Sequence, residues 1–150
     1  MNENRSEPDV VSHAVIGCDA AARATAAAVA KAREIGVRIN VAVCDSAGNL
    51  AAFLRMPGAF VQSIDIAIDK AYTAAGFGFP TGAWMQVVEG NEGMKLGFSA
   101  RPRLVVFGGG LPIRINDQLV GGVGVSGASE AQDEDCARAA LAALGAADDN

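Results

Sequence analysis

The chain has 150 residues and a formal net charge of −5, and 51% of its residues are hydrophobic against 19% charged. This length fits one domain, and the apolar share is enough for a sizeable core. The 12 lysine and arginine residues are scattered along the sequence, whereas a nucleic-acid-binding surface needs them clustered. We therefore expect a single domain over residues 1–150 that does not bind nucleic acid.

Neither a membrane-spanning segment nor a secretion signal is visible in the sequence. Gly, Arg, Asp or Asn interrupts every apolar stretch before it reaches the roughly 18–20 residues that a membrane span needs. Residues 1–11 are polar and lack the apolar segment of a signal peptide, so we expect them to form a flexible leader. The sequence therefore predicts a cytoplasmic protein that does not associate with membranes.

The three cysteines, Cys18, Cys44 and Cys136, are far apart and form no C-x-x-C pair. A zinc ribbon or a thioredoxin-type site needs such a pair, and a single histidine leaves no material for a Cys/His cluster. We expect no zinc, and we interpret the cysteines as free thiols in a reducing compartment.

The N-terminal half predicts a helix followed by a β-hairpin. Residues 18–35 are rich in alanine, and Gly36 stands where a helix usually ends. Apolar residues alternate with others over 37–43, which is the period-2 pattern of a strand. Residues 45–49 have turn composition, and residues 50–56 predict the returning strand.

The middle of the chain predicts two helical segments and a loop. Apolar residues recur at helical spacing over 60–75, and Gly76 and Gly78 are placed to end that helix. A shorter helical segment follows over 81–88. Residues 89–102 contain three glycines and a proline, and we expect a long loop there, of the kind that is often functional or mobile.

The C-terminal part predicts three more strands. Residues 103–107 (RLVVF) form one, and residues 113–115 and 119–126 flank a turn and form a second hairpin. Strands joined by short turns are antiparallel, and these elements do not alternate as a Rossmann sheet requires. We therefore predict an α+β fold in which five antiparallel strands are covered on both faces by helices.

A last helix is predicted from its start signals. Ser129 followed by Gln132 is a capping box. The acidic residues within 130–135 lie where the helix dipole favours negative charge, which explains them better than a metal site does. Gly145 ends the helix, and we expect residues 146–150 to fray.

Residues 122–127 match the dinucleotide-binding pattern G-x-G-x-x-G. A dinucleotide fold also needs a following strand and an acidic residue about 20 positions on, whereas only one predicted helix follows here. We expect no NAD. Glycines inside a strand instead allow a helix, a neighbouring subunit or a flat ligand to approach the backbone.

Gly108, Gly109 and Gly110 are the second unusual glycine segment. Three successive glycines carry a conformational-entropy cost, so they indicate either a sharp bend between strands or room for a ligand. In the second case their exposed amides bind a carboxylate or another anion. We expect the backbone near 108–110 and 121–127 to leave space beside the sheet for a guest molecule.

Four sequence blocks occur in the order found in one known family. They are VAVCDSAGNLAAFLRMPGA, IDKAYTAAGFGFPT, VFGGGLPI and LVGGVGVSGASEAQDEDCARAAL. In this order they resemble the GlcG/HbpS-like proteins (the DUF336 domain), from about Ala22 to Leu144. The resemblance implies a profilin-like three-layer α/β/α fold and homo-oligomers from dimers to octamers. It also implies haem binding or haem sensing, because several members of the family bind haem.

The resemblance makes the identity of a haem ligand the next question. Similar domains bind haem through a histidine near the N-terminus of the domain, and His13 is the only histidine of this chain. His13 is therefore the candidate axial ligand, and the alternative interpretation is an exposed side chain without a role. Arg101, together with Arg103 and Arg114, is close in sequence to the glycine segment and suits haem propionates or another small anionic ligand.

A second hypothesis is an isomerase, tautomerase or hydrolase that acts on a carboxylated metabolite of a catabolic pathway. Lys70 and Thr73 share one face of a helix, and together with Thr81 and the glycine segment they could line one small pocket. Lys70 and Arg114 are then the candidate catalytic groups, and Thr73, Thr81 and Arg101 bind the ligand. In the alternative interpretation, Lys70 pairs with an acidic neighbour on a solvated face.

Overall fold

The computed structural model describes residues 6–148, which form five helices and a four-stranded sheet. The helices are α1 (Cys18–Ile35), α2 (Gln62–Phe77), α3 (Trp84–Val87, after a 3-10 turn over Thr81–Ala83), α4 (Glu92–Ser99) and α5 (Glu130–Ala143). The strands are β1 (Asn40–Asp45), β2 (Leu50–Arg55), β3 (Gly110–Ile115) and β4 (Gln118–Ser126). Of the expected leader and tail, residues 1–5 and 149–150 lie outside the described residues. None of the helices within 6–148 has the length and apolar character that crossing a membrane requires.

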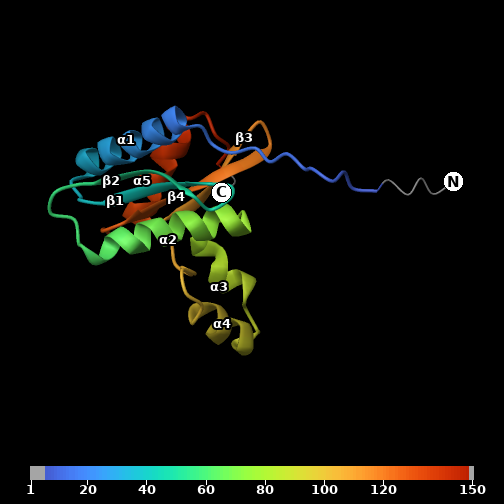
Figure 1. Ribbon diagram of the computed structural model, residues 1–150. Coiled ribbons are helices and arrows are strands. Elements are labelled where there is room, and N and C mark those ends of the chain that lie inside the picture. Colours follow the sequence, from blue (N-terminus) through green and yellow to red (C-terminus); the bar gives the residue numbers. More distant parts are fainter. Residues whose placement is uncertain (1–5, 149–150) are drawn as a thin grey trace.

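The strands form one antiparallel sheet in the order β2-β1-β4-β3, which lies between two helical layers (Figure 1). α1 and α5 pack on one face of this sheet, and α2 covers the other. Because side chains alternate along a strand, Val41 and Val43 enter the α1–α5 layer while Ala42 and Cys44 face α2. The predicted α+β fold, with helices on both faces of an antiparallel sheet, is confirmed.

The sheet has four strands within the described residues rather than the predicted five. Residues 103–107 form no strand because their backbone bonds to a helix side chain instead. Thr73 Oγ1 donates to the Arg103 carbonyl at 3.0 Å and accepts from the Val105 N–H at 3.2 Å. Arg103 also has a φ of +65°, which the extended conformation of a strand does not permit. The prediction of a strand here is wrong because a tertiary contact replaces the strand ladder.

The end of one helix and the structure of one predicted loop differ from what the sequence predicts. α2 continues through Gly76 and ends at Gly78, which adopts the left-handed conformation with φ +76°. Part of the expected loop over 89–102 forms α4, and the Asn91 side chain caps its start by accepting a hydrogen bond from the Met94 N–H at 2.9 Å.

α2 approaches β4 closely because β4 carries glycines on the face beneath the helix. A Cβ at Gly124 would overlap the carbonyl oxygen of Ala67, and one at Gly122 would lie 2.7 Å from the backbone nitrogen of Ala75. Real Cβ atoms do not tolerate such contacts with backbone, so both positions require glycine. The space that the sequence predicts beside residues 121–127 is therefore filled by α2 at these two positions.

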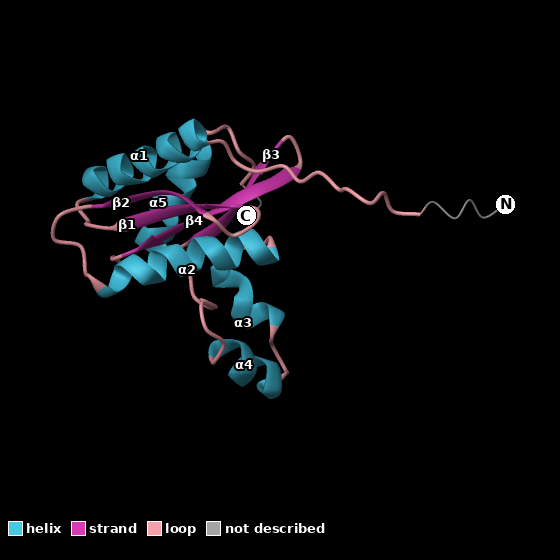
Figure 2. Ribbon diagram, viewed as in Figure 1, coloured by secondary structure: helices cyan, strands magenta, loops and turns pink. Residues whose placement is uncertain are grey.

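α3 and α4 form an arm that projects from the body beyond α2 (Figure 2). A cluster of aromatic rings forms its base: the Trp84 ring centroid lies 4.7 Å from that of Phe77 and 4.9 Å from those of Phe79 and Phe98. Trp84 is 1% exposed, and its Nε1–H has no hydrogen-bond partner among residues 6–148. This cluster fixes the arm against the end of α2.

The chain after α5 is bonded to the body as far as it is described. The Ala147 N–H donates to the Arg114 carbonyl at 3.2 Å, and the Asp148 carboxylate lies 3.4 Å from Arg138 Nε. Residues 146–148 of the expected tail are therefore held against β3 and α5.

Candidate functional site

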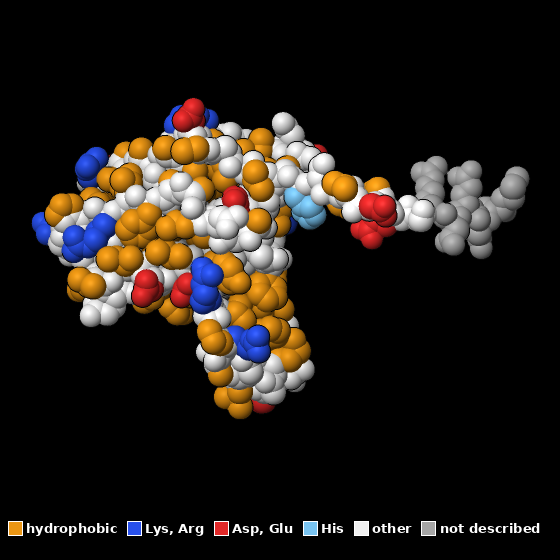
Figure 3. Space-filling view, viewed as in Figure 1, with side chains coloured by type: hydrophobic (Ala, Val, Ile, Leu, Met, Phe, Trp, Pro, Cys, Tyr) orange, Lys and Arg blue, Asp and Glu red, His pale blue; other side chains and the backbone are white. Residues whose placement is uncertain are grey.

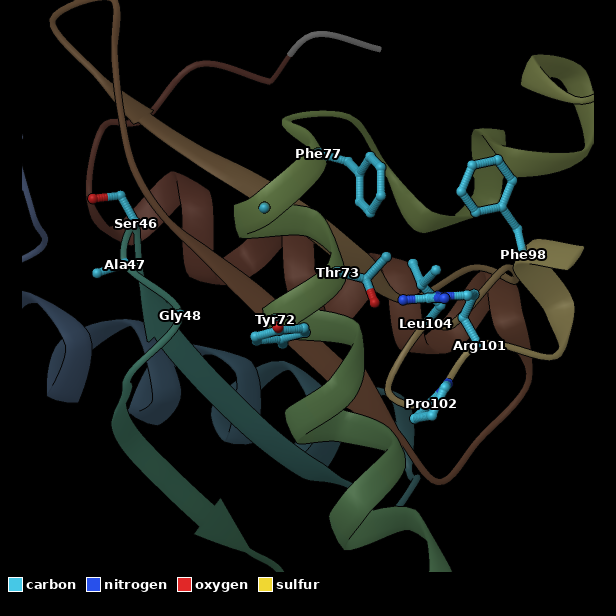
Figure 4. A pocket seen from close by; sticks show the side chains of 11 residues that line it. Ser46, Ala47, Gly48, Tyr72, Thr73, Phe77, Phe98, Arg101, Pro102 and Leu104 are labelled. Atoms are coloured by element: carbon cyan, nitrogen blue, oxygen red, sulfur yellow. The ribbon is translucent and has the colours of Figure 1, made fainter. Parts of the chain in front are cut away.

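A cavity of about 640 Å³ lies on the side of α2 that faces away from β4 (Figure 4). It is bounded by the turn between β1 and β2 on one side and by the chain from the end of α4 to residue 104 on the other. Its volume is within the range of small-molecule and cofactor sites. The lining residues are Ser46, Ala47, Gly48, Tyr72, Thr73, Gly76, Phe77, Phe98, Arg101, Pro102 and Leu104.

The floor of this cavity is α2, on which Tyr72, Thr73 and Gly76 line it. Gly76 lies inside the helix, where glycine costs about 0.5–1 kcal/mol relative to alanine. A Cβ at Gly76 would meet no atom within 4 Å. Unlike Gly122 and Gly124, Gly76 is therefore not required by packing, and its missing side chain leaves the floor open.

Aromatic rings and one arginine form the wall on the side of the arm. The rings of Phe77 and Phe98 meet edge to face, with centroids 6.3 Å apart and planes at 89°. Figure 4 shows the Arg101 side chain extending past Leu104 toward Thr73. The Arg101 guanidinium forms no hydrogen bond or ion pair with residues 6–148, so its charge is available to an anionic ligand.

Contacts between α2 and the segment after α4 hold this wall in place. The guanidinium carbon of Arg103 lies 3.6 Å from the centroid of the Tyr72 ring, and Arg103 Nε donates to Asp69 Oδ1 at 3.1 Å. The two backbone hydrogen bonds of Thr73 add to these contacts. Thr73, which the sequence predicts as a ligand-binding residue, lines the cavity. Its hydroxyl is hydrogen-bonded to the backbone of residues 103 and 105, and these bonds hold the segment that follows Arg101 against α2.

The segment between the leader and α1 passes the opposite rim of the cavity. Ser46, a lining residue, donates from Oγ to the Ala14 carbonyl at 2.5 Å. Two residues further on, the Ile16 N–H donates to the Val120 carbonyl at 3.0 Å and holds this segment against β4. His13 is exposed and directly precedes Ala14. The candidate haem ligand is therefore one residue away from a contact at the rim.

Lys70 points from α2 into the interior and is 1% exposed. Its Nζ donates to the Val125 carbonyl at 2.8 Å, lies 3.3 Å from Asp133 Oδ2 and is 5.0 Å from the centroid of the Phe107 ring. Asp133 is 3% exposed, and its Oδ1 accepts from the Ala128 N–H at 2.9 Å. Lys70 does have an acidic partner, but the pair is buried between α2, β4 and α5 rather than on a solvated face.

Burial governs the protonation of this pair. Desolvation lowers the pKa of Lys70 and raises the pKa of Asp133, and the attraction between the two groups opposes both shifts. Asp133 is not among the site residues predicted from the sequence, because the start of α5 already accounts for the acidic residues there; the capping box at Ser129 is confirmed. The available signal was its spacing: Asp133 lies four and seven residues before Ala137 and Ala140, both buried on α5.

The amides of the glycine segment bind groups of the chain itself. The Gly108 N–H donates to Glu130 Oε1 at 2.6 Å, and the Gly110 N–H donates to Thr81 Oγ1 at 2.9 Å. A carboxylate therefore does bind at this segment, but it belongs to α5. These two amides are already hydrogen-bonded within the protein and are not available to a ligand.

The predicted site residues fall into separate groups. Thr73 and Arg101 line the large cavity together. A Cβ at Gly109 would lie 2.6 Å from Lys70 Nζ, so the glycine segment packs against the buried amine. Arg114 lies apart from both groups, and its Nη2 donates to the backbone carbonyl that follows α2 at 2.7 Å.

Comparison with known proteins covers most of the chain. Residues 16–142 match the family model described as haem degrading protein HbpS-like. The chain belongs to the HbpS-like family. It is 42% identical over 124 residues to a 15.0 kDa protein of the dhaT–dhaS intergenic region of Citrobacter freundii, a match over 81% of this chain and 87% of that protein.

Two solved structures of this family share the fold. Klebsiella pneumoniae protein ORFY has a TM-score of 0.86 at 34% identity and covers 95% of this chain and 99% of its own. A PduOC:heme complex has a TM-score of 0.80 at 31% identity, with 89% and 97% covered. Full-length PduO of Salmonella typhimurium is longer, and the chain spans 36% of it. The family that the four sequence blocks predict is confirmed.

We expect Lys70→Met and Asp133→Asn each to lower the free energy of unfolding by about 3–5 kcal/mol at pH 7, because each leaves a buried charge without its partner. In Lys70→Met the loss should shrink as the pH falls, because burial raises the pKa of Asp133. The fold tolerates the protonated carboxyl and disfavours the carboxylate, so this penalty disappears toward the unfolded-state pKa of about 4. Urea unfolding at neutral and acidic pH measures both effects.

Lys31→Met is the control, since it breaks the exposed pair with Glu34, at 3.4 Å. It should cost less than about 1 kcal/mol. A Lys70→Met variant that is no less stable than Lys31→Met at pH 7 would contradict the importance of the buried pair.

Proposed function

We propose that this protein binds haem in the cavity on α2. The observation that carries the proposal is the Arg101 guanidinium, which has no partner among residues 6–148 and lines a cavity of about 640 Å³ with Phe77 and Phe98 in its walls. Aromatic walls offer ring faces to a flat apolar macrocycle, and a cation pairs favourably with its propionates. The heme complex of the relative PduOC supports the choice of ligand.

Three parts of the chain would hold the group. Phe77 and Phe98 would contact the porphyrin, and Arg101 would pair with a propionate. His13 would ligate the iron from the rim, since histidine is among the few side chains that ligate haem iron. Bound haem would supply an iron centre for sensing or redox chemistry. The role of the chain is to bind and orient this group, with the contacts of Arg103 keeping the wall in place.

The alternative function is an enzyme that acts on a small carboxylated metabolite. Arg101 beside Thr73 favours it, because the same cation would bind the carboxylate of a planar acid. Lys70, whose pKa burial lowers, would then be the candidate acid–base group and Arg114 the second candidate. Thr81 and the glycines at 108–110 would act through their packing around Lys70.

We also propose that the protein is cytoplasmic. Its three cysteines are free: Cys18 is exposed, and Cys44 and Cys136 are buried. Burial raises the pKa of each buried thiol to about 11, which keeps both protonated and unreactive. Free thiols of this kind persist in a reducing compartment.

We further propose that the chain forms homo-oligomers, from dimers to octamers. The arm carries exposed apolar side chains, with Val87 53%, Met94 41% and Leu96 70% exposed. Figure 3 shows hydrophobic side chains over much of the arm. Contiguous exposed apolar surface is typical of protein interfaces, and the arm of a second copy would cover it.

Titration of the full chain with haemin should give a saturable Soret band. His13→Ala should change its position because the axial ligand is lost, and Arg101→Gln should weaken binding about tenfold because a charge-assisted hydrogen bond is lost. Arg33→Gln, on α1 and outside this cavity, should bind as the unchanged chain does. A chain that shows no saturable Soret band does not bind haem, and the metabolite enzyme then takes its place.

Gly76→Leu should fill the floor of the cavity without disturbing the fold, because a Cβ at this position meets no atom within 4 Å. We expect unchanged or slightly higher stability, since glycine is a poor helix former, together with at least tenfold weaker haemin binding. Gly97→Leu is the matched control, because Gly97 also lies in a helix with open space around its Cβ position but outside the cavity. Equal haemin affinity in the two variants would place the ligand elsewhere.

Leu96→Asp should reduce the subunit number measured by sedimentation velocity, because it puts a charge in the apolar surface of the arm. Val10→Asp is the control, since Val10 is 83% exposed on the leader and should leave the assembly unchanged. A chain that sediments as a monomer at all concentrations would contradict this assignment.

A further inference from the structure

A second cavity, of about 160 Å³, lies where the end of β4 meets the first turns of α2 and α5. It shares no lining residue with the large cavity. Its lining includes polar side chains: Ser63 comes from α2, Ser126 from β4, and the Lys70–Asp133 pair forms its base. The site is therefore separate from the proposed haem site.

Hydroxyl groups in this cavity lack hydrogen-bond partners. Ser63 and Ser126 are each 6% exposed, and neither hydroxyl forms a hydrogen bond with residues 6–148. Neither oxygen is among the fully buried unpartnered atoms of residues 6–148, so both hydroxyls are open to the cavity and available to a ligand.

Asn40 adds a third unpartnered group beside the cavity. It is the cross-strand partner of Ser126, and its Nδ2 donates to the Phe60 carbonyl at 3.1 Å. Its Oδ1 is buried and has no donor among residues 6–148. Both Ser126 and Phe60 line the cavity, so the unmet acceptor lies directly behind it.

The charged groups of the cavity, by contrast, already have partners. Lys70 is paired with Asp133, and the second oxygen of Asp133 accepts from the Ala128 N–H. Glu130 accepts from the Gly108 N–H. An ionic ligand would find no unpaired opposite charge of comparable burial, and the unmet requirement is for neutral hydrogen-bonding groups.

The size and rim of the cavity restrict the ligand further. A volume of 160 Å³ corresponds to about five water molecules at liquid density, which suits a molecule of a few heavy atoms. Phe60 and Phe107 line the opening and are 65% and 44% exposed, so they offer apolar ring faces to a carbon skeleton.

We propose that this cavity binds a small, neutral, hydroxylated molecule, whose hydroxyl groups bond to Ser63 and Ser126 while its carbon atoms contact Phe60 and Phe107. Binding also supplies a donor toward Asn40, directly or through a bound water. Lys70 and Asp133 orient the site and keep their own ion pair.

The test compares three probes of similar size and different charge: glycerol, ethanolamine and glycolate. Each is titrated into the isotope-labelled full chain, and the backbone amide shifts of residues 126–128 are followed by NMR. We expect saturable shifts with glycerol alone. The double variant Ser63→Ala/Ser126→Ala should weaken glycerol binding about tenfold or more, whereas Ser99→Ala, an exposed serine on α4, should not change it.

Phe60→Ala is a second variant for the case that the double variant does not fold. Because the Phe60 side chain is largely exposed, its loss should leave the fold intact. It should also weaken glycerol binding several-fold. Saturation by ethanolamine or glycolate rather than glycerol would overturn the proposed ligand class. Absence of saturable shifts with any probe would show that the cavity holds water only and would overturn the site. Neither result bears on haemin binding, which is measured separately.

Discussion

The backbone of α2 lies directly against β4, where Gly122 and Gly124 leave no side chain between helix and strand. This contact brings Lys70 within hydrogen-bonding distance of the Val125 carbonyl and within 3.3 Å of Asp133 on α5. A buried ammonium group needs an opposite charge nearby, and Asp133 near the start of α5 supplies it. The position of α2 therefore also determines where α5 begins. The two helical layers are thus coupled through the sheet by one ion pair.

Residues of α2 line two different cavities. Ser63 and Lys70 contribute to the small cavity at the end of the sheet, while Tyr72 and Gly76 line the large one. The two cavities differ in what they can recognise, since one offers neutral hydroxyls and the other a guanidinium that has no partner within residues 6–148. A substitution on α2 that affects one cavity can therefore leave the other intact.

Local signals explain what the sequence predicted well. The hairpin, the long helices and the capping box each depend on neighbouring residues, and each is present. The predicted strand over 103–107 does not form because the side chain of Thr73, thirty residues before Arg103, is hydrogen-bonded to the backbone of this segment. Sequence patterns carry no information on such a contact.

The candidate site could be predicted only in part for the same reason. Thr73 and Arg101 do share a cavity, but Lys70 and Arg114 do not come together. Gly76 was interpreted as a helix end because glycine usually is one, whereas here it stays helical and opens a cavity floor. The buried charge pair joins helices from opposite faces of the sheet, and the sequence pattern does not encode how these helices are placed.

Trp84 has a practical consequence. It is the one tryptophan of the sequence, it is buried at the base of the arm, and its indole N–H lacks a partner among residues 6–148. Its neighbours Phe77 and Phe98 belong to the wall of the large cavity. With excitation selective for tryptophan, the emission of the protein therefore originates at a single residue, so changes in its wavelength or intensity report on the arm and the cavity wall without any added label.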